Sequence, residues 1–288
     1  MKLKKSTKNL IGFIAIVLII MIITIGTISY VQDYLFFPTC YNEECYKLLV
    51  NSSSPQYKEI QIDNNGKKLN GWVKFNVIAN EKAPLVIFFV GNYQDSSGTF
   101  VNFEKNGMYS YFENYNIMII DYPGYGLSDG KPSDKTMFEA ALKAYDYAIE
   151  QEYVDVNNIV ILGYSIGTGV ATYVASERNV NGLILISPYD RALSLYNDAA
   201  NIFYGPMKLL AKYEFNSIQY AQNVKVSPLI ITSYKDEIIK YKFSLNLANY
   251  FENVYKTIVL DDATHIDYFE KGEVLTNIYE YLQSVLYK

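Results

Sequence analysis

Short apolar runs recur along the chain from residue 85 onward, each flanked by polar or turn-forming residues. Runs of this kind are typical of parallel strands that are buried on both faces of a sheet. They predict six strands, at residues 85–90, 117–120, 159–162, 183–186, 229–231 and 257–260. Two earlier segments, 58–62 and 69–78, flank a turn signal at 63–67 and predict a hairpin that precedes them.

Helical apolar spacing appears between these strands, at residues 137–151, 241–251 and 273–286. Alternating strands and helices predict an α/β fold, with a mostly parallel, doubly wound sheet flanked by helices. The longest interval between strands, 191–227, predicts a small helical insertion. Such an insertion can lie over a site as a lid, or its helices can be ordinary parts of the scaffold.

The N-terminal region has a different pattern. Lys2, Lys4, Lys5 and Lys8 precede a stretch, residues 10–31, that carries no charge at all. That length predicts a transmembrane helix, and Lys before it with acids after it predict a cytoplasmic N-terminus. A cleavable signal peptide is the alternative, with a weak cleavage signal at residues 26–29.

The chain therefore divides into a basic cytoplasmic tail (1–9), an anchor (10–31), a linker (32–56) and one domain (57–288). We expect a single-pass protein of the cell membrane, with its domain on the extracytoplasmic side.

Composition narrows the function classes. Of the 288 residues 50% are hydrophobic, which is ample for one large core, and the net charge is −5. Without a basic cluster beyond the first residues, nucleic acid is not an expected partner. The two cysteines, Cys40 and Cys45, can pair outside the cell or remain free thiols. No metal or cofactor motif is present, so we expect neither.

The sequence Gly163-Tyr164-Ser165-Ile166-Gly167 stands between a predicted strand and a helical stretch at 170–175. Strand, sharp turn and helix are the context of the Gly-x-Ser-x-Gly nucleophile elbow. Glycine two residues on either side of the serine lets strand and helix approach closely. The pattern makes Ser165 a candidate nucleophile.

A serine hydroxyl needs a base to take its proton and an acid to orient that base. His265 is the one histidine, and it follows the last predicted strand. Asp236 follows the strand before it and is the candidate acid, with Asp190 as the second choice. The order Ser, Asp, His is the order of α/β-hydrolases.

With these residues the chain resembles the α/β-hydrolase superfamily, and within it the membrane-anchored α/β-hydrolase-domain proteins of the serine-aminopeptidase and lysophospholipase-like group. The resemblance covers residues 57–286 and includes Phe89-Val90-Gly91-Asn92 and the long motif at 121–130, to which we assign a structural role. It implies an oxyanion hole made of the backbone N–H groups of Asn92 and Ile166. Two positions depart from the family, with Val90 in place of His and Ser233 in place of Gly.

The sequence thus predicts a membrane-anchored serine hydrolase that cleaves an ester, thioester or amide. A small-molecule or lipid acyl ester is the favoured substrate, because the site is tethered near a bilayer. A serine peptidase and an acyltransferase would use the same three side chains. A non-catalytic binding module that keeps the fold is a further alternative, suggested by Val90.

Overall fold

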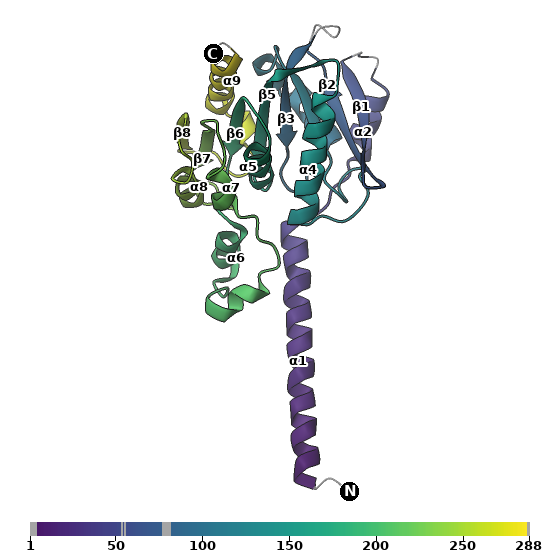
Figure 1. Ribbon diagram of the computed structural model, residues 1–288, viewed down its shortest axis with the longest axis vertical. Coiled ribbons are helices and arrows are strands. Elements are labelled where there is room, and N and C mark those ends of the chain that lie inside the picture. The colour runs from purple at the N-terminus through teal and green to yellow at the C-terminus, as the bar shows by residue number, and fades with distance from the viewer. Residues whose placement is uncertain (1–4, 53, 55, 77–81, 287–288) are drawn as a thin grey trace.

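The computed structural model describes residues 5–52, 54, 56–76 and 82–286. An eight-stranded sheet runs through the domain in the order β1-β2-β4-β3-β5-β6-β7-β8 (Figure 1). β1 and β2 form the antiparallel hairpin, β2 pairs antiparallel with β4, and the remaining strands pair in parallel. The strands are β1 (Tyr57–Asn64), β2 (Lys67–Lys74), β3 (Ala83–Phe89), β4 (Asn116–Ile120), β5 (Val154–Tyr164), β6 (Gly182–Ile186), β7 (Leu229–Ser233) and β8 (Lys256–Leu260).

The sheet confirms the predicted fold class. Every residue of β4, β6 and β7 is buried, which is the reason that most side chains of these strands are apolar. In parallel pairs the carboxyl ends of the strands meet at one edge. The turns that follow β3, β5, β6 and β7 therefore lie together.

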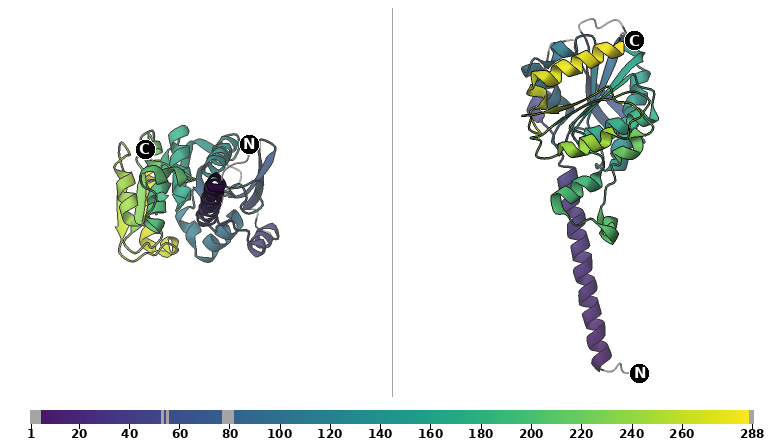
Figure 2. Two further views of the ribbon diagram at one scale, coloured as in Figure 1. Left: turned by 90° about the horizontal axis from the view of Figure 1, so that it is seen from below. Right: turned by 90° about the vertical axis from the view of Figure 1, so that its left-hand side faces the viewer.

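Helices cover both faces of the sheet (Figure 2). α4 packs against α5 and α5 against α7 on one face, while α9 contacts η1 on the other, where α3 also lies. The helices are α3 (Ser96–Lys105), η1 (Met108–Tyr111), α4 (Asp134–Ile149), α5 (Gly167–Glu177), α8 (Tyr241–Ala248), η3 (Tyr268–Glu270) and α9 (Gly272–Leu286).

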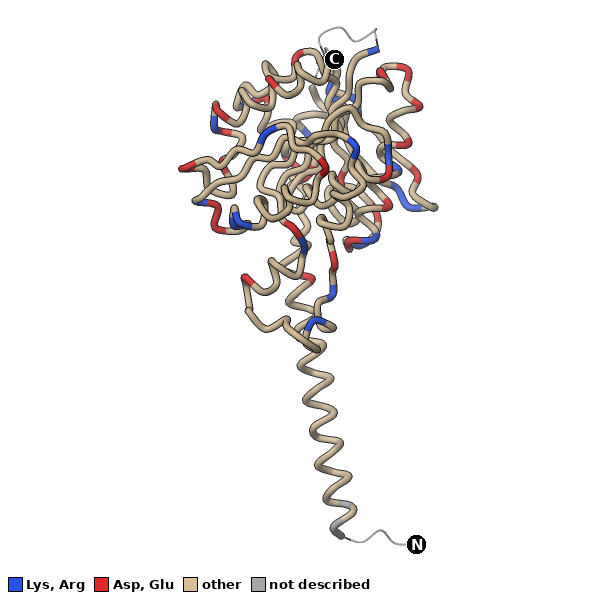
Figure 3. Tube along the Cα trace, turned by 60° about the vertical axis from the view of Figure 1, so that its left-hand side comes forward, with Lys and Arg blue, Asp and Glu red and all other residues tan. Residues whose placement is uncertain are grey.

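A single long helix, α1 (Lys5–Phe36), projects from the domain (Figure 1). Its segment Asn9–Phe36 is long and apolar enough to cross a membrane, with a mean hydropathy of 2.9, and its most apolar 18-residue stretch has no buried residue. Figure 3 shows no charged residue along most of its length. Such a helix is what the uncharged stretch in the sequence predicts.

The segment between α1 and the sheet is structured. α2 (Glu43–Val50) begins at Asn42, whose side chain accepts a hydrogen bond from the backbone N–H of Cys45. Phe36 and Phe37, at the end of α1, are buried in the domain core together with Leu49 of α2. The residues predicted as a linker thus hold the last turn of α1 and a short helix packed on the domain. Cys40 and Cys45 are both free thiols.

The predicted insertion contains three short helices, α6 (Ala192–Ala200), η2 (Gly205–Leu210) and α7 (Ser217–Ala221). α7 packs against α5 and belongs to the scaffold. α6 and η2 instead extend away from the sheet and lie beside the upper part of α1 in both side views (Figures 1 and 2).

Candidate active site

Ser165 lies at the tip of a tight turn between β5 and α5. Its φ of 54° is in the left-handed region, which residues other than glycine rarely adopt. A Cβ on Gly163 would lie 2.7 Å from the Cβ of Ala171, and a Cβ on Gly167 would collide with the backbone oxygen of Phe89. Both glycines of the motif are therefore required by the close approach of strand and helix.

The structure brings the three predicted catalytic side chains together. Ser165 Oγ lies 2.9 Å from His265 Nε2, and His265 Nδ1 lies 3.0 Å from both carboxylate oxygens of Asp236. His265 is in the turn after β8 and Asp236 in the turn after β7. Hydroxyl, imidazole and carboxylate at these distances form the Ser-His-Asp arrangement in which a base can take the serine proton.

The environment of Asp236 favours its charged form. Burial alone would raise the pKa of this carboxyl, but hydrogen bonds from His265, Ser187 and the backbone N–H of Ile239 outweigh burial and lower the pKa below its usual value. Ser187 Oγ donates to Asp236 Oδ2 at 2.5 Å, and Tyr268 donates to the same oxygen at 2.9 Å. An ionised Asp236 can accept the Nδ1–H of His265 and hold the tautomer whose Nε2 faces Ser165.

Asp190, the second candidate acid, has other partners. Its carboxylate accepts hydrogen bonds from the backbone N–H of Arg191 at 2.7 Å and from the side-chain amide of Asn246 at 2.7 Å. These bonds connect the start of α6 to α8. Of the two aspartates, Asp236 is the one in contact with His265.

Asn92 and Ile166, whose backbone N–H groups are predicted to form the oxyanion hole, both line the pocket above Ser165. Among the hydrogen bonds recorded for the described residues, neither the N–H of Asn92 nor that of Ile166 donates to a protein acceptor. Ile166 also stands at the N-terminal end of α5, where the helix dipole favours negative charge. Both groups are thus available to an oxygen that becomes charged above Ser165.

The motif at 121–130 makes hydrogen bonds to the loop that contains Val90 and Asn92. Tyr122 donates to the backbone oxygen of Val90 at 3.0 Å, and Tyr125 donates to the side-chain oxygen of Asn92 at 3.2 Å. Asp121 accepts a hydrogen bond from the backbone N–H of Ser96 at 2.6 Å, while its burial raises the pKa of the carboxyl to about 7. Val90 itself is fully buried, so its side chain packs in the core.

A cavity of about 490 Å³ opens above Ser165. Leu195, Tyr196 and Ala199 of α6 line one part of it, and Ile238 and Ile239, after β7, line another. Cavities of this size that combine apolar walls with a few polar groups hold small organic ligands.

The last turn of α1 also lines this cavity, through Leu35 and Phe36. Phe36 packs against Tyr196 of α6 with ring centroids 4.6 Å apart, and against Tyr213 at 5.9 Å. The helix that could cross a membrane therefore ends as a wall of the candidate active site.

Sequence reasoning missed several of these residues. Ser187 directly follows β6, so its position at the carboxyl end of a buried strand was a usable signal. Tyr268 lies three residues after His265, and nothing in the local pattern distinguishes it from the other 28 of the 29 tyrosines. The contribution of Leu35 and Phe36 depends on how α1 meets the insertion, which no local pattern encodes.

No candidate metal centre occurs in the part of the chain that the structure describes, where no three His, Cys, Asp or Glu side chains cluster suitably.

Comparison with known proteins agrees with this fold. A model of the alpha/beta hydrolase fold family matches residues 84–206. The alpha/beta hydrolase domain-containing protein 17C of Xenopus tropicalis is 29% identical over 174 residues, which are 60% of this chain and 54% of that protein. An uncharacterised protein of Mycobacterium tuberculosis is 25% identical over 219 residues, 75% of each chain. The match with the first of these relatives thus spans about half of the relative's length.

Solved structures have the same fold at low sequence identity. An alpha-beta hydrolase from Vibrio vulnificus has a TM-score of 0.68 at 18% identity, covering 89% of this chain and 92% of its own. The esterase Est1E of Butyrivibrio proteoclasticus, solved with ferulic acid, has a TM-score of 0.64 at 20% identity and covers 80% of this chain and 100% of its own. These comparisons give the chain the fold of the α/β-hydrolases, and residues 84–206 are similar to that family's model.

Proposed function

We propose that this protein is a membrane-anchored serine hydrolase that cleaves an acyl ester, thioester or amide through an acyl-enzyme. The contact that carries the proposal is the 2.9 Å distance from Ser165 Oγ to His265 Nε2, together with the 3.0 Å distance from His265 Nδ1 to Asp236. A retained fold without activity would not need this alignment, which leaves the non-catalytic binding module as the weaker alternative.

The reaction follows from the positions of these groups. Ser165 Oγ attacks the acyl carbonyl carbon while its proton moves to His265 Nε2. The oxygen that becomes negative accepts hydrogen bonds from the N–H groups of Asn92 and Ile166. The tetrahedral intermediate then breaks its bond to the alcohol, thiol or amine, which leaves with the proton from His265.

Water completes the cycle by the same route. It attacks the acyl-serine carbon, gives its proton to His265, and the acid is released when Ser165 recovers that proton. An acceptor alcohol in place of water would make the protein an acyltransferase, and product analysis with and without added alcohols distinguishes the two.

An acyl chain is the substrate class that suits the cavity best. Its walls are formed mainly by Leu35, Phe36, Leu195, Ile238 and Ile239, which are apolar side chains. A chain of methylene groups gains free energy when it leaves water for such walls. Cleavage of peptides without turnover of any acyl ester would refute this choice of substrate.

The anchor and its direction are part of the proposal. Lys2, Lys4, Lys5 and Lys8 precede the apolar segment, which favours a cytoplasmic N-terminus and an extracytoplasmic domain. Protease added to intact cells should then degrade the domain. A domain that survives this treatment but is degraded after the cells are lysed would overturn the orientation.

A fluorophosphonate probe tests the catalytic proposal on the full chain in membranes. The probe should label the wild type and the matched control Ser194→Ala, whose hydroxyl belongs to α6 outside the triad, and should not label Ser165→Ala. Equal labelling of wild type and Ser165→Ala, or no labelling of a wild type that unfolds cooperatively on heating, would refute it.

A further inference from the structure

The insertion is attached to α1 at a defined height along the helix. The side-chain amide of Gln32 donates to the backbone oxygen of Leu210 at 2.9 Å and its oxygen accepts from the N–H of Lys212 at 2.7 Å. Lys212 Nζ lies 2.5 Å from Asp33 Oδ1, and Tyr213 also donates to Asp33. The end of η2 is therefore fixed beside the turn of α1 that contains Gln32.

The position along α1 at which the insertion is attached matches the surface of a bilayer that α1 would cross. From Leu10 to Thr27 the side chains that the structure describes are exposed, and contact with the domain begins at Ile28. At 1.5 Å per residue the exposed length is roughly 27 Å, close to the ~30 Å hydrocarbon core of a membrane. If α1 spans the bilayer with this length, η2 lies where the helix leaves the hydrocarbon.

The segment from Ile202 to Leu209 exposes apolar side chains at that height. Leu209 is 88% exposed, the largest exposed fraction recorded for a large apolar residue in the described part of the chain. Ile202, Tyr204 and Met207 are 46%, 55% and 43% exposed. Exposed apolar groups clustered on one short segment indicate an interaction surface, and tyrosine is common where hydrocarbon meets water.

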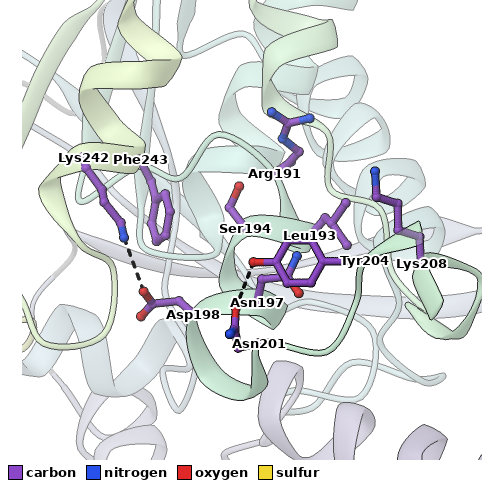
Figure 4. Close-up of a pocket in the computed structure, with 10 residues that line it drawn as sticks. All are labelled: Arg191, Leu193, Ser194, Asn197, Asp198, Asn201, Tyr204, Lys208, Lys242 and Phe243. Atoms are coloured by element: carbon purple, nitrogen blue, oxygen red, sulfur yellow. Dashed lines mark hydrogen bonds and ion pairs between the residues drawn. The ribbon is translucent and has the colours of Figure 1, made fainter. Parts of the chain in front are cut away.

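A basic cleft borders the same segment (Figure 4). Its volume is about 560 Å³, and Arg191, Lys208 and Lys242 line it with only one acid, Asp198. Lys242 lies 3.6 Å from Asp198, as the dashed line in Figure 4 marks. Arg191 also lies 3.9 Å from Asp190, and Lys240 lies 2.8 Å from Asp198. Four cations against two carboxylates still leave an excess of positive charge, which complements lipid phosphates.

We propose that residues 202–209, named here the insertion tip, form a second membrane-contact surface beside the anchor. Leu209, Met207 and Tyr204 enter the interfacial layer of the bilayer that α1 crosses, and the basic cleft faces the phosphate groups of that leaflet. The proposal rests on the anchoring part of the proposed function. It adds that α6, a wall of the catalytic cavity, is held at lipid level, so that an acyl chain reaches Ser165 from the leaflet.

Tryptophan quenching by brominated lipids tests the contact on the full chain in vesicles. Trp72, the native tryptophan, is buried in β2 and gives a constant background. A probe at Leu209→Trp should lose most of its added fluorescence in dibromo-phosphatidylcholine. The matched control Val156→Trp, another exposed apolar position, at the start of β5 and at the opposite end of the sheet from Ser165, should lose none.

A third probe, Ile19→Trp, reports on the anchor alone. Quenching at positions 19 and 209 but not at 156 supports the proposal. Quenching at 19 with equal, low quenching at 209 and 156 overturns it and leaves the anchor intact. No quenching at 19 overturns the anchor and the contact together.

An activity measurement tests whether the insertion tip helps a membrane-held substrate to reach Ser165. Leu209→Asp should lower turnover of a long-chain acyl ester held in vesicles several-fold and leave turnover of a short water-soluble ester unchanged, because Leu209 is outside the catalytic cavity. Ile149→Asp, an exposed position at the end of α4, is the control and should change neither. Equal turnover of the vesicle substrate by wild type and Leu209→Asp argues against the contact. A wild type that hydrolyses neither ester refutes the proposed activity, while the quenching result still decides the contact.

Discussion

The hydrogen bonds around Asp236 lead to a quantitative prediction for Ser187→Ala and Tyr268→Phe. Each change removes one donor to Asp236 Oδ2 and leaves the bond to His265 in place. A hydrogen bond to a charged group stabilises the folded state by about 1.5–3 kcal/mol. Each variant should therefore lose stability of that order, which lowers Tm by roughly 2–4 °C per kcal/mol in a domain of this size.

The effect on the rate should be much smaller than the loss of the carboxylate. Without Ser187 the pKa of Asp236 rises, but it rises from below its usual value near 4, so the group remains ionised at pH 8. His265 keeps its partner, and kcat should fall by less than about tenfold, or 1.4 kcal/mol. Asp236→Asn, by contrast, favours the wrong imidazole tautomer and should lower kcat by about 10⁴.

The assay is hydrolysis of a short water-soluble ester between pH 5 and 9, with thermal unfolding of the same samples. Because the Asp236 carboxyl stays ionised throughout this pH range, a positioning role has a signature that simple destabilisation lacks: kcat is lower at every pH while the variant is fully folded, and the shape of the profile is unchanged. Ser176→Ala, which removes a hydroxyl bonded within α5 to the Tyr173 carbonyl, is the control and should leave the profile unchanged. A Ser187→Ala variant as inactive as Asp236→Asn yet fully folded at the assay temperature would refute this reasoning.

Three further changes test other parts of the site. Gly167→Ala should lower the free energy of unfolding by at least about 1–3 kcal/mol, because the added Cβ would collide with a backbone oxygen. The control is Gly272→Ala, whose added Cβ meets no atom within 4 Å and which should leave the urea midpoint nearly unchanged. Equal urea midpoints for the two variants would contradict the geometry. Ionised Asp236 stabilises the folded state at pH values above the pKa near 4 that it has in the unfolded chain, and this stabilisation is lost as the pH falls through its lower pKa in the folded protein. The urea midpoint of wild type should therefore drop more steeply in acid than that of Asp236→Asn. Leu35→Trp should fill part of the cavity and lower kcat/KM for long acyl esters more than for short ones, and an equal loss for both would argue against an acyl pocket there.

The sheet could be predicted from sequence because burial on both faces leaves a strong local pattern. β6 and β7 consist of five buried residues each, and each strand contains a run of leucine and isoleucine. The proximity of Ser165, Asp236 and His265 could be predicted for a related reason, since they lie in the turns after β5, β7 and β8, and carboxyl ends of parallel strands meet at one edge. The one histidine left no choice of base.

Other features depend on contacts between distant segments and leave no local pattern. α3 begins at Asp95, whose side chain caps Gly98 N–H, but its helix mixes serine, glycine and aromatic residues without a clear apolar stripe. α2 is only eight residues long, and its burial depends on packing against α3. Ser187 acquires its role only when β6 lies beside β7 and brings the hydroxyl to Asp236.

The packing of Phe36 on Tyr196 has a practical consequence for work on this protein. Removing Met1–Phe36 to obtain a water-soluble protein would also remove a side of the cavity above Ser165 and uncover the aromatic rings of Tyr196 and Tyr213. Specificity measured on such a shortened protein would describe a wider, wetter chamber than the one in the full chain. Detergent or nanodisc preparations that retain the helix are therefore the proper material for testing the proposed activity.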